Sequence, residues 1–115
     1  MSNDDPVVTN PQYYQVMFEN DFVRVLEYTD VPGVRTTPHV HPNSVMVTLS
    51  DFDRRLVTPA GTREVSLVSG KALWLPAQRH SGENTGVTPT HVIFVELKGE
   101  ASGDQYAGSI GPQPD

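Results

Sequence analysis

The short stretch PHVHPNS at residues 38–44 places two histidines one residue apart. In an extended strand, side chains at positions i and i+2 point to the same face, so His39 and His41 would project their imidazole rings together. At a rise of about 3.3 Å per residue, the two positions lie about 6 to 7 Å apart along the backbone. No cysteine or carboxylate is adjacent, and imidazole ligands suit Zn, Cu, Fe and Ni. The two histidines could therefore bind one metal ion together.

An H-x-H pair alone is a weak signal, because two histidines beside prolines can equally be surface residues. His80, in LPAQRHSGEN, is a third candidate ligand and lies beyond several intervening strand-like segments. A closed antiparallel barrel can bring such a distant strand next to the first. His91 opens the last strand-like run and could join the site as a fourth ligand or a base, although a position within the sheet explains it as well.

The elements that must position these rings are short strands. No window of a dozen residues shows the apolar spacing of a helix, and ten prolines and nine glycines divide the chain into runs rich in Val, Leu, Phe, Tyr and Thr. TPAG at residues 58–61 is typical of a hairpin turn. The sequence therefore predicts an all-β sandwich or barrel, with strands in these segments: YQVMF, FVRVLEY, RTTPHVH, VMVTL, RRLVT, REVSLV, ALWLP, the region around RHSGEN, and HVIFVELK.

The length of 115 residues suits one domain, and the absence of cysteine excludes disulfides and thiolate metal sites. We expect a flexible N-terminal segment at residues 1–10 and a β-barrel domain at residues 11–99. Residues 100–115 are dominated by Gly, Ser, Pro and Asp and are expected to form a flexible tail, or an arm that orders only against a partner.

Charge and hydropathy restrict the classes of molecule that the protein is expected to bind. The net charge is −6 and the eight basic residues are scattered, which argues against a nucleic-acid surface. The first dozen residues lack the pattern of a secretory signal, and no stretch approaches the ~18 apolar residues of a membrane span. We therefore expect a cytoplasmic protein without nucleic-acid or membrane partners. The segment YQVMF could pair across subunits, so a homodimer is expected.

Two stretches taken together resemble the paired motifs of the cupin superfamily. GVRTTPHVH at residues 33–41 is similar to the first half of the first motif, a glycine, five residues and then H-x-H. GKALWLPAQRHSGEN at residues 70–84 is similar to the second motif, in which glycine, proline, histidine and asparagine follow in this order. The likeness covers about residues 16 to 98. It implies a double-stranded β-helix, or jelly-roll barrel, with a mononuclear metal inside one end.

This chain departs from the usual cupin pattern in two places. The usual first motif continues with a glutamate four or five residues after its second histidine, and those positions hold Val45 and Met46 here. The turn between Pro76 and His80 is one residue shorter than usual, with Gln78 where glycine is expected. The first departure leaves a ligand set of three neutral imidazoles: His39, His41 and His80.

Three protein ligands leave positions open for water, substrate or dioxygen, which is typical of a catalytic metal site. With neutral ligands a divalent ion keeps its full charge and favours a small anionic or chelating substrate. Several all-histidine cupins are iron-dependent dioxygenases, so the resemblance favours one Fe(II) per chain and a dioxygenase, with Zn, Mn, Ni or Cu as other metals. The alternatives are a redox-neutral lyase, isomerase or cyclase, and a non-catalytic cupin that binds a small ligand.

Three more residues could take catalytic roles. If RTTPHVH is one continuous strand, Arg35 shares the face of the histidine pair and could hold a substrate carboxylate. Gln78 could hydrogen-bond a metal-bound water or a histidine N–H. Glu83 is the carboxylate nearest in sequence to the third histidine and could act as a general base. Each of the three can also be explained as a solvated residue near a turn.

Overall fold

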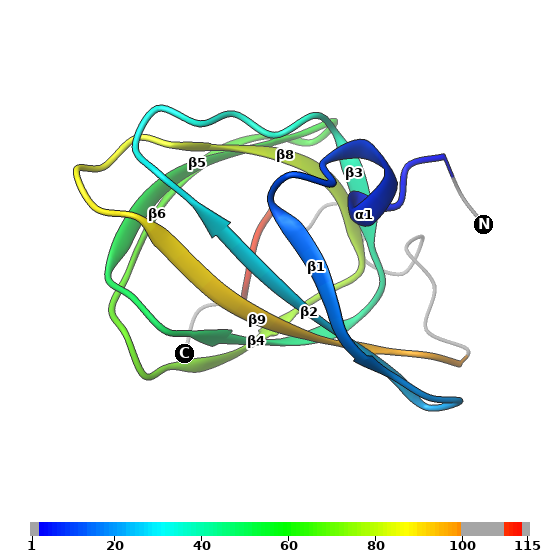
Figure 1. Cartoon of the computed structure of the whole chain (residues 1–115). Helices are drawn as coiled ribbons and strands as arrows, with labels where there is room; N and C mark the ends of the chain where they lie inside the picture. Colours follow the sequence, from blue (N-terminus) through cyan, green and yellow to red (C-terminus); the bar gives the residue numbers. More distant parts are fainter. Residues whose placement is uncertain (1–2, 100–109, 114–115) are drawn as a thin grey trace.

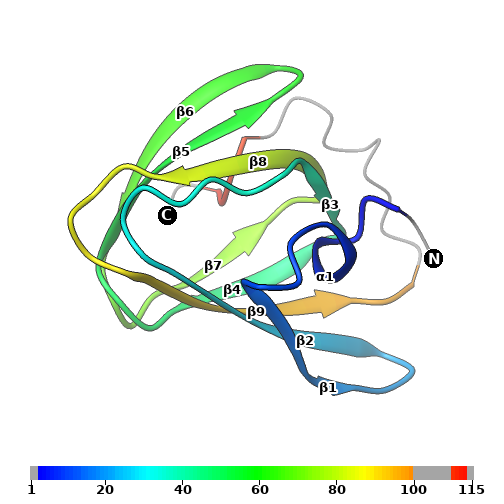
Figure 2. The same ribbon diagram turned by 45° about the horizontal axis from the view of Figure 1, so that its top comes forward.

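The strands expected from the sequence form two sheets that close around an interior, as Figures 1 and 2 show. The computed structural model describes residues 3–99 and 110–113. In this part of the chain the elements are α1 (Pro6–Thr9), β1 (Tyr14–Glu19), β2 (Val23–Asp30), β3 (His39–His41), β4 (Ser44–Thr48), β5 (Phe52–Thr58), β6 (Gly61–Leu67), β7 (Ala72–Leu75), β8 (Gln78–Asn84) and β9 (Thr90–Leu97).

The five-stranded sheet has the order β1-β2-β9-β4-β7, and the four-stranded sheet has the order β3-β8-β5-β6. The strand pairs are antiparallel. Neighbours in a sheet are often distant in sequence, as β2 and β9 are in one sheet and β3 and β8 in the other. This connectivity is that of a jelly roll, so the predicted all-β, double-stranded β-helix is confirmed.

Alternation along each strand divides its side chains between the interior and the outer surface. In β5, Phe52, Arg54 and Leu56 are buried and the residues between them are exposed. β9 alternates in the same way, and its inward side ends with Glu96. The interior therefore holds charged groups beside its apolar cluster, which consists of Tyr14, Leu26, Tyr28, Met46, Phe52, Leu75, Val92 and Phe94.

The N-terminal segment, expected to be flexible through residue 10, instead packs on the barrel from Asp5 onward. The side chain of Asp5 caps α1 by accepting from the N–H of Val7 at 2.9 Å, and it pairs with Arg24 at 2.9 Å. The amide oxygen of Asn10 accepts from the N–H of Thr37 at 2.7 Å. A helix of four residues is too short to show a periodicity in the sequence, which explains why no sign of it was evident there.

The C-terminal tail was expected over residues 100–115, and residues 100–109 and 114–115 lie outside the described part of the chain. Residues 110–113 lie against the barrel. Nη1 of Arg63 donates to the carbonyl oxygens of Ile110 and Pro112 at 2.7 Å each. The N–H of Gln113 donates to the carbonyl of Trp74 at 2.7 Å. These four residues therefore belong to the folded domain rather than to a free tail.

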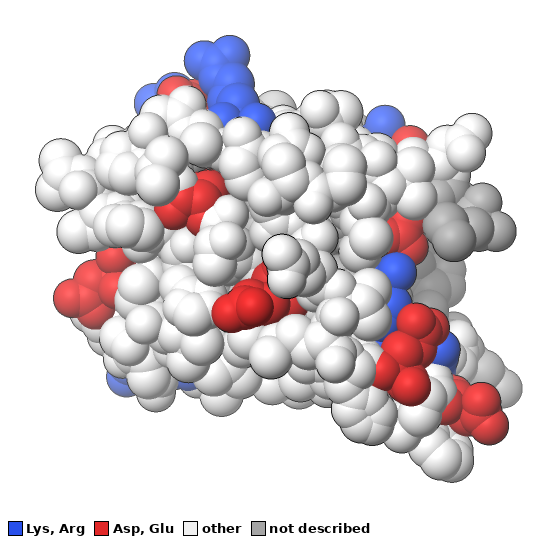
Figure 3. All heavy atoms as spheres, viewed as in Figure 1, with Lys and Arg blue, Asp and Glu red and all other residues white. Residues whose placement is uncertain are grey.

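Charges on the face shown in Figure 3 form small groups, and Lys and Arg atoms lie beside acidic atoms there. Ion pairs of the described residues include Arg24 with Asp5 and Lys98 with Glu19. Among the described residues, no helix is long and apolar enough to span a bilayer.

Candidate metal centre

The three histidines singled out in the sequence meet in the barrel interior. β3 pairs with β8, and in this register His39 lies opposite His80 and His41 opposite Gln78. The three rings are buried, with centroids 4.8, 4.9 and 5.0 Å apart. Each residue offers one ring nitrogen, and these three nitrogens all lie within 4.8 Å of one another.

Local sequence explains why these rings point inward together. β3 is a three-residue edge strand bounded by Pro38 and Pro42, which cannot donate to a sheet ladder and so limit the strand to the H-x-H segment. Both histidines of this strand are buried and Val40 between them is not fully buried. In β8 the same alternation buries His80 and leaves Arg79 exposed. Strand parity therefore places all three imidazoles inside.

Hydrogen bonds behind the rings fix the tautomers of the first two histidines. Nδ1 of His39 lies 2.7 Å from the carbonyl oxygen of Thr37, and Nδ1 of His41 lies 3.1 Å from Oε2 of Glu96. Both partners can only accept, so both Nδ1 atoms carry the proton. The side-chain nitrogen of Asn10 also lies 3.3 Å from Nδ1 of His39, but both of its hydrogens have closer acceptors. Both Nε2 atoms are thus unprotonated.

Gln78 fixes the tautomer of His80 in the same way. Its Nε2 donates to the carbonyls of Pro76 and Gly111 at 3.0 and 3.1 Å, which defines the orientation of the amide. Its Oε1 then accepts from the N–H of Gly111 and from Nδ1 of His80, both at 2.7 Å. All three Nδ1 atoms are therefore donors, and three unprotonated Nε2 atoms remain. This donor set fits a divalent transition metal.

Burial keeps the rings of His39 and His80 in the neutral state that ligates metal. Burial, followed by the neighbouring charge of His41, lowers the pKa of His39 to about 3. Burial also holds the pKa of His80 well below its ordinary value, with further contributions from His41 and His39. Imidazoles in this environment need not lose a proton before they bind a cation at neutral pH.

Glu96 is a residue of the candidate site that sequence reasoning missed. It is 2% exposed and bridges two groups, accepting from His41 through Oε2 and from Nε of Arg24 through Oε1 at 2.9 Å. A carboxylate behind a ligating histidine raises the basicity of the ring. Its signal in the sequence was a charged residue with the inward parity of the apolar run HVIFVEL.

Tyr14 was missed as well. Its hydroxyl lies 3.2 Å from Nε2 of His39 and 3.3 Å from Nε2 of His41, on the side of the rings where the ligand nitrogens converge. Burial, and then the nearby Tyr28, raise the pKa of Tyr14 well above its usual value, so the phenol stays a hydrogen-bond donor. Nothing in the segment YQVMF distinguishes this tyrosine from an ordinary core residue.

Arg35 and Glu83 do not lie with the histidines. The side chain of Arg35 is 76% exposed, and its Nε pairs with Oε1 of Glu83 at 3.4 Å on the outer surface. The segment before β3 is not a continuous strand, so parity counted back from His39 fails and Thr36 is buried instead. Glu83 has the opposite parity to His80 within β8 and therefore points outward.

His91 also lies apart from the three histidines. It is an outward residue of β9, and its Nε2 lies 2.6 Å from a carboxylate oxygen of Glu27 on the neighbouring β2. This location agrees with the alternative interpretation of His91 as an ordinary residue within the sheet. Gln78, in contrast, lies directly behind the site, as its bond to His80 shows.

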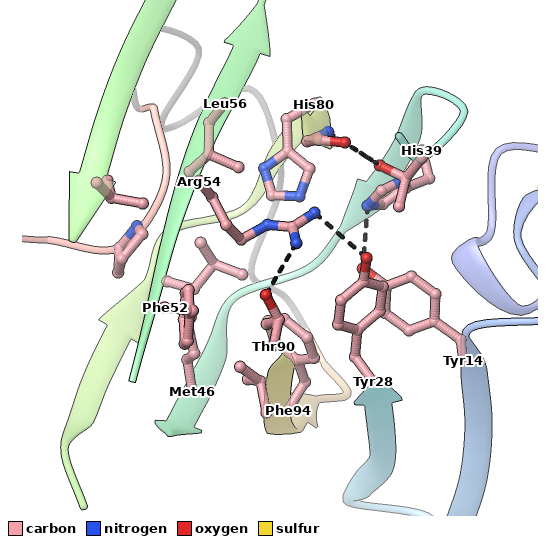
Figure 4. A pocket seen from close by; sticks show the side chains of 16 residues that line it. Tyr14, Tyr28, His39, Met46, Phe52, Arg54, Leu56, His80, Thr90 and Phe94 are labelled. Carbon is pink, nitrogen blue, oxygen red and sulfur yellow. Dashed lines mark hydrogen bonds between the residues drawn. The ribbon is translucent and has the colours of Figure 1, made fainter. Parts of the chain in front are cut away.

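A small cavity adjoins the histidines inside the barrel (Figure 4). The space open to the centres of water-sized spheres is about 40 Å³. Its wall includes His39 and His80 on one side, apolar residues such as Phe94, and the side chain of Arg54. Pro112 from the C-terminal segment also lines it. A ligand at the three Nε2 atoms would thus face a partly enclosed, mostly apolar space with one guanidinium.

Comparison with known proteins gives the same fold. No family model and no curated protein matches the sequence. A cupin domain from Bordetella pertussis has a TM-score of 0.70 and 27% identity, over 75% of this chain and 92% of that one. A protein with a double-stranded β-helix domain from Klebsiella pneumoniae has a TM-score of 0.61 and 22% identity, over 89% and 84%.

The polyketide cyclase RemF from Streptomyces resistomycificus is also similar, with a TM-score of 0.54 and 21% identity over 73% of this chain and 63% of that one. Its likeness extends to the fold alone. The two histidine motifs, the jelly-roll connectivity and these structural neighbours agree, and the chain is therefore a small cupin by fold, with a buried group of three histidines.

Proposed function

We propose that this protein is a mononuclear metalloenzyme in which His39, His41 and His80 hold one divalent transition metal. The favoured activity is that of an Fe(II)-dependent dioxygenase that acts on a small chelating substrate. The observation that carries the proposal is the hydrogen-bonding pattern behind the rings. Three acceptors fix three Nδ1–H groups, so three lone pairs converge at one point in the barrel interior.

The position of these histidines favours catalysis over a structural role. A structural metal site is closed by four protein ligands, whereas three histidines leave positions open. Those positions would face the small cavity rather than packed side chains. A bound Fe(II) would supply Lewis acidity and a site for dioxygen. The chain itself would orient the substrate and keep bulk water out through the apolar wall formed by residues such as Met46, Leu75 and Phe94.

The second candidate is a redox-neutral enzyme, such as a lyase, isomerase or cyclase, that uses Zn, Mn or Ni. The hydroxyl of Tyr14 favours it, because this donor lies beside the Nε2 atoms of His39 and His41 and could hydrogen-bond a substrate oxygen there. The fold also occurs in the polyketide cyclase described above.

Oxygen uptake separates the two candidates. Protein purified anaerobically and loaded with Fe(II) would be mixed with diketones, thiols and phenolic acids, and oxygen consumption would be followed with an electrode. A dioxygenase consumes oxygen only with both iron and substrate present, and His39→Ala should abolish the signal. Turnover without oxygen uptake supports the redox-neutral enzyme. Ligand binding without any turnover contradicts both and leaves a non-catalytic binding protein.

A further inference from the structure

We propose that Arg54 is the subsite for a carboxylate group of the substrate, and that the substrate is a small carboxylic acid with a second oxygen donor. This inference rests on the proposed function, because that second donor would bind the metal held by the histidines. Arg54 lies on β5, far in sequence from both histidine motifs, and replaces the exposed Arg35 as the arginine that can reach the site.

The guanidinium of Arg54 lies inside the barrel and next to the histidines. The residue is 8% exposed, and it lines the same cavity as His39 and His80. Figure 4 shows the guanidinium between His80 and Tyr28, at the centre of the cavity wall. A cation in this place acts on whatever occupies the cavity, since the low dielectric of the interior strengthens the interaction.

One side of the guanidinium is held firmly by the protein. Nη1 donates to Oδ2 of Asp30 at 2.5 Å and lies 3.2 Å from Oγ1 of Thr90. Nη2 donates to the hydroxyl of Tyr28 at 3.3 Å, and Cζ lies 5.1 Å from the centre of the Tyr28 ring. Asp30 is itself held by the amide of Asn84 at 2.9 Å. These contacts fix the plane of the guanidinium before any ligand arrives.

The other side of the guanidinium is free to bind a ligand. Within residues 3–99 and 110–113, no acceptor is bonded to Nε–H of Arg54, and Nη2 is bonded only to the hydroxyl of Tyr28. Nε–H and the second N–H of Nη2 form the parallel fork that matches the two oxygens of a carboxylate.

Gly82 makes room for the guanidinium of Arg54 beside β8. A Cβ atom at residue 82 would lie 2.7 Å from Nη2 and 3.3 Å from Nε of Arg54. Gly82 also lines the cavity, and its lack of a side chain lets the guanidinium lie close to β8 at this position. Any larger residue would push the guanidinium out of this position.

Charge in the interior favours an anionic substrate. Three neutral imidazoles would leave the full charge of a divalent metal uncompensated. Asp30 offsets Arg54, and Glu96 already pairs with Arg24 at 2.8 Å. No further carboxylate of the described residues lines the cavity. A substrate carboxylate would therefore neutralise charge that the protein itself leaves unpaired.

Size restricts the substrate further. A cavity of about 40 Å³ holds roughly three water molecules, at about 10–15 Å³ each. A carboxylate on the fork of Arg54 and one hydroxyl or keto oxygen toward the histidines would fill most of this space. Short 2-hydroxy and 2-oxo acids have this size and both groups, whereas large aromatic acids do not.

A pair of matched probes tests the subsite. Glycolate and glycolamide have the same number of non-hydrogen atoms, and only glycolate carries a charge. Their affinities for the zinc-loaded protein would be measured by calorimetry in the wild type, in Arg54→Gln and in Asp30→Asn/Arg54→Gln. The double variant removes both charges, so no unpaired charge stays buried if the single variant fails to fold. Arg55→Gln is the control, since this neighbouring arginine points outward to Glu64.

The wild type and the control should bind glycolate more tightly than glycolamide. Loss of Arg54 should reduce this preference by about tenfold or more, with the metal content unchanged. An unchanged preference in variants that keep their metal overturns the subsite and leaves the metal site intact. A wild type that shows no measurable glycolate binding also overturns the subsite. Glycolate binding that depends on Arg54 in a protein that holds no metal supports the subsite and contradicts the proposed function instead.

Discussion

Single residues behind the histidines determine whether the rings can serve as ligands. Thr37, Gln78 and Glu96 each accept from one Nδ1–H, and they do so with three different groups: a backbone carbonyl, an amide and a carboxylate. Only the carboxylate is charged. The ring that it orients, His41, is therefore the one of these three histidines whose Nδ1–H faces a charged partner.

Replacing Glu96 tests this role. Glu96→Ala removes the acceptor of His41 and should weaken metal binding by about 10- to 100-fold, because the ring loses both its orientation and its charged partner. Competition with a chelating dye measures the affinity. Glu27→Ala is the matched control, since Glu27 partners the outward His91 instead. Wild-type affinity in Glu96→Ala would contradict the role assigned to this carboxylate.

Buried neutral histidines also make the metal-free protein sensitive to acid. The pKa of His39 is about 3 in the folded chain and ordinary in the unfolded chain, so the unfolded state binds more protons between these values. The stability contributed by the neutral ring is complete above about pH 6.5 and is lost as pH falls toward 3.

Thermal unfolding of metal-free protein between pH 7 and 4 measures this loss. Each such ring lowers the free energy of unfolding by up to about 1.4 kcal/mol per pH unit in that window. His39→Asn, which cannot take up the proton, should show a shallower slope, and His91→Asn should not. Equal slopes in His39→Asn and the wild type would show that burial of His39 does not weaken the fold in acid.

Strand parity predicted which histidines face inward but not the residues around them. His39, His41 and His80 are inward because each lies in a regular strand, where position alone decides the face. Arg35 lies outside such a strand, so the same rule failed there. Arg54 and Glu96 reach the site only because β5 and β9 pass beside it. This arrangement of strands is tertiary structure, which the local sequence pattern does not reveal.

At the scale of elements, the strands and hairpins were predictable and the terminal segments were not. TPAG indeed forms the turn between β5 and β6, because its proline and glycine favour a tight turn locally. α1 and residues 110–113 gain their structure from contacts with the barrel instead. The sequence of these segments is polar and short, and it carries no periodic signal.

The C-terminal segment should influence the metal site through Gln78. The backbone of Gly111 bonds both ends of the Gln78 amide, and the same amide orients His80. A chain that ends at Gly99 should therefore bind metal more weakly and unfold at a lower temperature. A chain that ends at Gln113 keeps these contacts and serves as the control. Identical metal affinity in both truncated chains would show that the segment does not support the site.

At the scale of the whole molecule, the exposed surface of β1 predicts that the protein self-associates through this strand. β1 is an edge strand that pairs with β2 within the described residues, and three consecutive apolar residues on it, Val16, Met17 and Phe18, are 45%, 57% and 48% exposed. The pairing register with β2 shifts between Val16 and Phe18, so strict alternation does not hold there, but all three apolar side chains reach the surface. A second copy of the chain could add to the free edge and cover them.

Sedimentation measures the oligomeric state. The wild type should be a dimer at micromolar concentration, and Met17→Lys/Phe18→Glu should shift it to the monomer, because charged groups on an edge strand oppose pairing. Val87→Lys is the control, since Val87 is 92% exposed in a turn outside β1. A wild type that sediments as a monomer would contradict the predicted dimer.

The central claim is that three imidazoles hold one metal ion inside the barrel, and elemental analysis of purified protein tests it most directly. The chain offers its own control, because its fourth histidine, His91, lies on the outer surface beside Glu27. We predict one transition-metal ion per chain in the wild type and in His91→Ala, and a severe loss in each of His39→Ala, His41→Ala and His80→Ala. Wild-type metal content in any one of those three variants would contradict the account.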